Sequence, residues 1–145
     1  MTGINHGYAI PIDPDNAFKA VSNSRRRQIL LSLTQSEDPL TASELALEIA
    51  AIENLVDPSE VTSEQRTRVY ISLIQSHLDT LDELGVAEYD DRGKKIKPTD
   101  ATQPIARHIR TITTACYKPE GANIKDLNGT NYETSSMQEG TDGTQ

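Results

Sequence analysis

The side chains best suited to chemistry in this sequence are cations and amide or hydroxyl donors, and they gather in three short segments. An unbroken run of arginines occupies 25–27, a second group lies within 66–76, and a third lies within 92–97. Guanidinium and ammonium groups bind phosphate, while arginine and glutamine can also pair with the edges of guanine and adenine. The candidate nucleic-acid contacts are Arg25, Arg26, Arg27, Arg66, Arg68, Tyr70, Ser72, Gln75, Ser76, Arg92, Lys94, Lys95 and Lys97.

Patterns that support covalent chemistry are missing from the sequence. It has no glycine-rich phosphate loop, nucleophile elbow or paired-carboxylate motif. The single cysteine, Cys116, excludes a disulfide framework and a metal site built from cysteine alone. His77 has no second ligand at metal-binding spacing, so we expect a structural histidine. We therefore expect no enzyme activity, no cofactor and no metal.

The charge of the chain is acidic overall but unevenly distributed. The 145 residues carry a net charge of −8, and residues 118–145 hold two lysines against five acidic residues, which leaves −5 for residues 1–117. Clustered cations on an acidic body can still meet phosphate, although the acid excess weakens non-specific binding. The same excess is expected of a protein that stays soluble in concentrated salt.

The sequence has no feature that predicts a membrane or secreted protein. No segment approaches the roughly 18 consecutive apolar residues of a membrane-spanning helix. The N-terminus lacks the basic and apolar regions of a signal peptide. We expect a cytoplasmic protein.

Helical periodicity and capping residues predict five helices. Their expected ranges are 16–23, 24–35, 43–55, 63–84 and 102–117. The first is expected to be capped by Asp15, and the third by the capping box of Thr41 and Glu44. The arginines at 25–27 fall in the first turn of the second helix, where the helix dipole disfavours cations. An external anion would explain them, and an ordinary solvated face is the alternative.

Residues 62–98 contain the most diagnostic order of elements. A long amphipathic helix at 63–84, the reader helix, ends at Gly85, and a strand pair at 86–98, the wing, follows around an Asp-Arg-Gly turn. The preceding helix at 42–54 can buttress the reader helix. This order predicts a winged helix-turn-helix, mainly α with a small β-hairpin, with the reader helix in the DNA major groove and the wing on the backbone.

The remaining segments complete the expected domain organisation. Residues 1–13 are an extended lead-in, residues 14–117 are the winged-helix domain, and residues 118–145 are a disordered acidic tail. The last helix has a one-sided apolar stripe that so small a domain has little means of covering, so we expect homodimerisation through it. The stripe consists of Ile105, Ile109 and Ile112.

Several motifs also carry a family resemblance. They are Ser22-Asn23 with Arg25–Arg27, Ser43–Ala46, Arg68–Tyr70 with Gln75 and His77-Leu78, Leu81-Asp82, and Gly85–Tyr89. In this order they resemble the winged-helix domains of haloarchaeal regulators related to the ArsR-type repressors, over roughly residues 15–100. The resemblance implies a DNA-binding transcription regulator of salt-loving archaea. Metal-sensing members carry Cys or His ligand pairs, and because this sequence has no Cys pair, metal regulation is not carried over.

Two functions remain open on the sequence. The first is a dimeric, sequence-specific regulator that binds double-stranded DNA. The second is a winged-helix protein-interaction module without DNA binding, which Asp90, Asp91 and the acidic net charge favour. A continuous positive stripe from 25–27 through Arg66 and Arg68 to the wing would favour DNA, whereas a broken stripe would favour protein contact.

Overall fold

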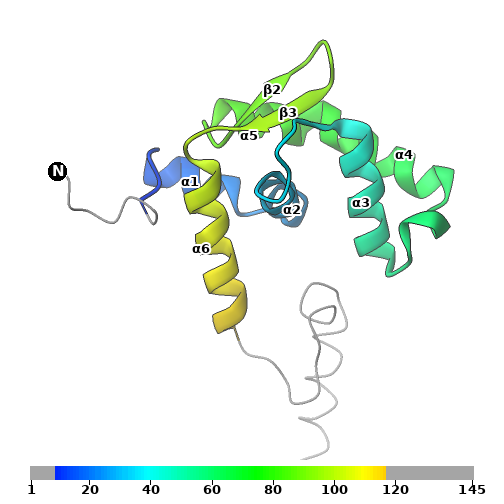
Figure 1. The fold of residues 1–145 in the computed structure, drawn as a ribbon, viewed down its shortest axis with the longest axis horizontal. Helices are drawn as coiled ribbons and strands as arrows, with labels where there is room; N and C mark the ends of the chain where they lie inside the picture. The colour runs from blue at the N-terminus through cyan, green and yellow to red at the C-terminus, as the bar shows by residue number, and fades with distance from the viewer. Residues whose placement is uncertain (1–8, 117–145) are drawn as a thin grey trace, which may run out of the picture. The chain divides into compact units, whose positions relative to one another are not determined.

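The computed structural model describes residues 9–116, and they are mainly helical with a small antiparallel sheet (Figure 1). The predicted tail at 118–145 and most of the predicted lead-in lie outside the described residues. The helices and strands are α1 (Pro14–Ala20), α2 (Ser24–Leu33), β1 (Leu40–Thr41), α3 (Ala42–Asn54), η1 (Pro58–Glu60), α4 (Ser63–Ser72), η2 (Leu73–His77), α5 (Leu78–Glu83), β2 (Ala87–Asp90), β3 (Lys95–Pro98) and α6 (Thr102–Ala115). The predicted class is confirmed at this level, and the arrangement is compatible with a winged helix.

The sheet has three strands in the order β1-β3-β2, all antiparallel. The predicted hairpin forms from β2 and β3, with Tyr89 opposite Ile96. The sequence did not predict β1, which pairs Leu40 with Ile96 and is too short to show alternation. The hairpin is also tied to α3, because the Ala42 N–H donates to the Lys94 carbonyl at 2.9 Å.

Capping side chains begin the helices largely as predicted. Thr41 with Glu44 and Thr62 with Gln65 both form complete capping boxes, at the starts of α3 and α4. Asn23 caps α2 by accepting from two backbone N–H groups.

The cap of α1 differs from the prediction. Asp13, rather than Asp15, is the N-cap residue, and its carboxylate accepts from the Asp15 N–H at 2.8 Å. Pro14 explains the difference, since proline fits the first helical position and lets the helix begin before Asp15.

The predicted reader helix is interrupted, so the expectation of one regular helix over 63–84 is wrong in detail. Residues 73–77 form a π turn, η2, between α4 and α5. The buried positions Val69, Leu73, Leu78 and Leu81 explain it, because their successive spacings are four, five and three residues. A regular α-helix would place Ser76 and His77 inward after Leu73. One extra residue per turn buries Leu78 instead and leaves Gln75 and Ser76 exposed.

The helix ends at Gly85, as predicted. Gly85 has a φ of 83°, and the N–H of Val86 donates to the Leu81 carbonyl at 3.1 Å, which is the bonding of a Schellman motif. Helix α3 ends in the same way at Leu55, which adopts a φ of 55° although it is not glycine.

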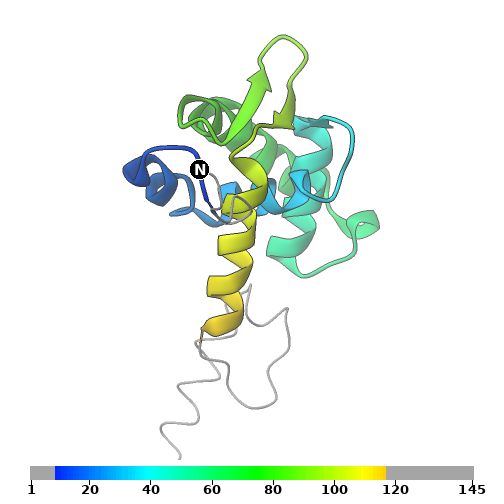
Figure 2. The ribbon, with the colours of Figure 1, turned by 60° about the vertical axis from the view of Figure 1, so that its left-hand side comes forward.

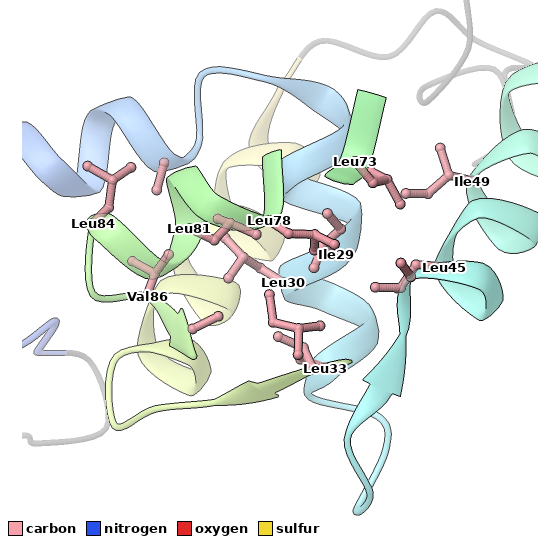
Figure 3. Close-up of a cluster of buried hydrophobic side chains, with 14 of the residues drawn as sticks. Ile29, Leu30, Leu33, Leu45, Ile49, Leu73, Leu78, Leu81, Leu84 and Val86 are labelled. Carbon is pink, nitrogen blue, oxygen red and sulfur yellow. The ribbon is translucent and has the colours of Figure 1, made fainter. Parts of the chain in front are cut away.

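The hydrophobic core surrounds α2. Figure 3 shows Ile29, Leu30 and Leu33 of α2 among side chains from α3, η2, α5 and the segment before β2. Each of these three is at most 1% exposed. Burying an aliphatic side chain of this size contributes about 1.5–3 kcal/mol, so this cluster fixes how the helices pack.

The premise for dimerisation through α6 is wrong for two of its three residues. Ile105 and Ile109 are 1% and 5% exposed, because they pack into the core of their own domain. Only Ile112, which is 60% exposed, is available to a partner. A helical stripe in the sequence does not distinguish a face buried within the domain from a face buried between subunits.

None of the helices among residues 9–116 combines the length and the apolar character needed to cross a membrane.

Candidate nucleic-acid interface

The reader helix lies against α3 and exposes one polar face. Val69 and Leu73 point into the core, while Thr67, Arg68 and Gln75 are exposed on the other side. Ser76 is exposed as well because of the π turn. Within residues 9–116, no carboxylate lies within 4.0 Å of the Arg68 guanidinium. Of the predicted contacts on the reader helix, Arg68, Gln75 and Ser76 are the ones placed to meet a ligand.

The wing lies beside α5, as both ribbon views show (Figure 1 and Figure 2). Arg92, Lys95 and Lys97 are exposed on it, and Lys94 is half-buried. Lys94 bonds Asp91 at 3.1 Å, which raises the pKa of that lysine, and Lys97 lies 3.8 Å from Glu88. Solvent and salt screen exposed pairs of this kind, so they hold the lysines only weakly.

Arg25 is bound within the protein. Its Nε donates to Glu53 at 2.6 Å, its Nη2 donates to the other carboxylate oxygen at 2.8 Å, and its Nη1 donates to Ser72 Oγ at 2.7 Å. The hydrogen bond that Arg25 donates to Glu53 raises the pKa of Arg25. One guanidinium therefore joins α2, α3 and α4, and it also turns Ser72 inward.

The other two arginines of the run also have internal partners. Arg26 is 9% exposed, and its Nη2 donates to the Lys19 carbonyl at 2.7 Å. Arg27 donates to the Val21 carbonyl at 2.7 Å. These bonds account for the run without an external anion, so the sequence-based explanation by an anion is not needed.

Two further predicted contacts serve packing. Arg66 donates to the carbonyl and hydroxyl oxygens of Ser43 at 3.1 and 2.6 Å, which ties the start of α4 to the start of α3. Tyr70 is half-buried and packs against the core.

The positive stripe is consequently broken. Its α2 part is bound internally, and what remains is Arg68 together with the wing cations. Acidic side chains are interleaved with these groups on the same elements, and all of them are exposed. They are Glu64, Asp79, Glu88, Asp90 and Asp91.

His77 is a packed structural histidine, as predicted. Its Nδ1 lies 3.3 Å from Arg26 Nη1, and because arginine can only donate, Nδ1 accepts and the ring is neutral. Burial lowers the pKa of His77, and the charges of Arg26 and Arg25 lower it further. No group of three or more metal-ligating side chains occurs within residues 9–116.

Sequence reasoning missed two kinds of residue at this interface. Ser43 and Glu53 position the reader helix through Arg66 and Arg25, and no local pattern reveals partners so distant in sequence. Ile71 is 43% exposed on the reader helix. Its signal was present, since it falls two residues from both Val69 and Leu73 and so lies off the apolar stripe.

Comparison with known proteins places the chain in a family but not in a functional class. Residues 18–97 match the model of a domain of unknown function, DUF7344. No curated protein and no solved structure matches the chain. The matched range runs from α1 to β3 and includes the reader helix and the wing, which is more than half of the sequence. The chain therefore belongs to the DUF7344 family.

Proposed function

We propose that this protein is a winged helix-turn-helix transcription regulator that binds double-stranded DNA through the reader helix and the wing. The supporting observation is that the reader helix exposes Arg68 and Gln75, which can hydrogen-bond to base edges, while its α5 segment packs against a hairpin that carries four cations. In the proposed complex the exposed face of α4 and η2 enters the major groove, and the wing contacts the adjacent backbone.

The residues divide by the chemistry that they offer to DNA. Arg68 can bond guanine O6 and N7, and Gln75 can bond adenine N6 and N7, so these two would set sequence preference. Ser76 lies beside Gln75 and can reach phosphate. The wing cations would contact phosphate whatever the sequence. They are Arg92, Lys94, Lys95 and Lys97.

A homodimer on a two-fold site remains part of the proposal, since paired reader helices match palindromic operators. Within α6 it would use Ile112, because Ile105 and Ile109 are already buried.

The broken positive stripe favours a second candidate. A winged-helix module that contacts proteins would need no continuous basic face, and the internal bonds of Arg25, Arg26 and Arg27 fit that function equally well. The wing carboxylates Asp90 and Asp91 favour it too.

Selection of bound sequences from random DNA in molar KCl tests the DNA-binding function. The selected site is then titrated against random DNA with the wild type, Gln75→Ala and a triple variant with Lys94, Lys95 and Lys97 changed to alanine. We expect Gln75→Ala to lose about 1–3 kcal/mol on the selected site alone, and the triple variant to weaken on both DNAs.

Lys19→Ala is the control for charge removal, because Lys19 is an exposed lysine of α1. It should leave both affinities unchanged. Equal losses of Gln75→Ala on the two DNAs would reject its role in sequence preference. A wild type that binds no DNA at any salt concentration would leave the protein-interaction module as the better account.

A further inference from the structure

Ile71 is an apolar side chain placed in the middle of a polar face. Four large apolar side chains are exposed among residues 9–116, and Ile71 is the one on the reader helix. It is 43% exposed, whereas Val69 and Leu73, two residues to either side, are 2% and 0% exposed. Ile71 thus points away from the core, toward whatever the reader helix meets.

The neighbours of Ile71 on this face are groups that recognise DNA bases or phosphate. Thr67 and Arg68 lie one turn before it and Gln75 lies one turn after it, and all three are exposed. Spacings of three and four residues put Arg68, Ile71 and Gln75 on one face of the helix. Arg68, Ile71 and Gln75 form one row, in which an apolar side chain lies between two side chains that can hydrogen-bond to base edges.

The floor of the major groove offers one apolar group, the C5-methyl of thymine. We propose that Ile71 is a specificity-determining residue that contacts a thymine methyl, beside a base pair that Gln75 contacts. This inference rests on the proposed DNA-binding function and adds a preference for thymine at one position of the site.

The surroundings of Ile71 favour a methyl group over a protein partner. Protein-docking surfaces are contiguous apolar patches, typically of several hundred Å². The other three exposed apolar side chains, Phe18, Leu55 and Ile112, lie on α1, at the end of α3 and on α6. On the reader helix Ile71 is the one large apolar side chain that is exposed, and its place between Arg68 and Gln75 matches one methyl better than an apolar patch.

Replacement of thymine by deoxyuridine in the selected site tests the contact, because it removes the methyl and keeps every hydrogen-bonding group. Each thymine is replaced in turn, and affinity is measured for the wild type, Ile71→Ala and the control Leu55→Ala. We expect the wild type to lose about fourfold at one thymine position, as for exposing one methyl group. Ile71→Ala should bind both DNAs equally, and Leu55→Ala should behave as the wild type.

Two results would overturn the role of Ile71 while leaving DNA binding intact. One is a wild type indifferent to every replacement. The other is an Ile71→Ala variant that keeps the wild-type ratio of affinities for the thymine and deoxyuridine sites, which includes an equal loss on both DNAs. A wild type that binds no DNA would instead refute the proposed function, and the role of Ile71 with it.

Discussion

Arg26 is a cation that closes a helix end. Its Nη2 and Nε donate to the carbonyls of Lys19 and Ala20, at 2.7 and 3.2 Å, where α1 ends. A cation is favoured at a helix C-terminus because the dipole there is negative. Burial lowers the pKa of Arg26 below its ordinary value, and the guanidinium is still charged at neutral pH. The side chain therefore works as a C-terminal cap for α1.

Replacement of Arg26 by methionine should destabilise the fold. The variant keeps the length of the side chain but leaves the carbonyls of α1 without their donor, which costs about 1–3 kcal/mol. Arg68→Met is the matched control and should change the free energy of unfolding by less than about 0.5 kcal/mol, since Arg68 is exposed. Urea unfolding followed by circular dichroism measures both. Equal stability of the two variants would contradict the capping role of Arg26.

His77 makes stability depend on pH. Its pKa is lowered in the folded protein, first by burial and then by Arg26 and Arg25, while Glu53 raises it. In the unfolded chain a histidine protonates near pH 6.5. Between these two pKa values the unfolded state binds more protons, so stability falls as pH drops below about 6.5.

The variant His77→Gln should lose this pH dependence, because glutamine does not titrate. Urea unfolding of the wild type and the variant at several pH values between 5 and 8 measures the effect. As the pH falls, the unfolding free energy of the wild type should decrease relative to that of His77→Gln. A difference that stays constant across this range would show that His77 does not titrate differently on folding.

At the scale of elements, α3 and α5 end in the same backbone conformation with different residues. Leu55 and Gly85 have φ values of 55° and 83°, and both helices end with Schellman bonding. Glycine tolerates a positive φ, whereas other residues lose roughly 1–2 kcal/mol there. Leu55 is also 46% exposed, so its side chain gains little from burial in return.

Glycine should therefore be more stable than alanine at both helix ends. We expect the free energy of unfolding of the wild type to exceed that of Gly85→Ala by about 1 kcal/mol. The free energy of unfolding of Leu55→Gly should exceed that of Leu55→Ala by the same amount. Thr67, which is exposed within α4, is the control position. There the alanine variant should have a free energy of unfolding about 0.5–1 kcal/mol above that of the glycine variant. Thermal unfolding of the five variants and the wild type gives these differences. Alanine equal to glycine at 55 would mean that the backbone there relaxes out of the left-handed region.

The elements that carry local signals were predictable from the sequence. The capping box at Thr41, the stop at Gly85 and the hairpin at 86–98 each depend on residues close together in the chain. The internal hydrogen bonds of the arginines at 25–27 were not predictable, because partners such as Glu53 and Ser72 come from other helices. For the same reason the burial of Ile105 and Ile109 could not be distinguished from a dimer interface.

At the scale of the whole molecule, internal bonding leaves few cations for phosphate. With the run at 25–27 occupied, the wing supplies four, which are Arg92, Lys94, Lys95 and Lys97. Each phosphate contact contributes about 0.9 to the slope of log K against log salt. We infer that affinity for DNA falls less steeply with salt than it would if the arginines at 25–27 also contacted phosphate.

Fluorescence anisotropy between 0.1 and 1 M KCl should give a slope of about −4 for each bound domain. Lys95→Ala should reduce its magnitude by about one, and Lys19→Ala should leave it unchanged. A slope near −6 or steeper for one domain would mean that Arg25, Arg26 or Arg27 exchanges its internal partners for phosphate.

The π turn also bears on which changes in chain length the fold accepts. Leu73 and Leu78 are both fully buried although five residues separate them, so the reader helix holds one residue beyond what a regular helix needs. Deletion of Ser76 would restore a spacing of four and leave both leucines in the core. The same deletion between Leu45 and Ile49 of α3, which are already four apart and buried, would carry one of them out of it. We therefore expect the reader helix to tolerate the loss of one residue without unfolding of the domain, and Arg68, Ile71 and Gln75 to stay in one row, because spacings of three and four residues suit a regular helix.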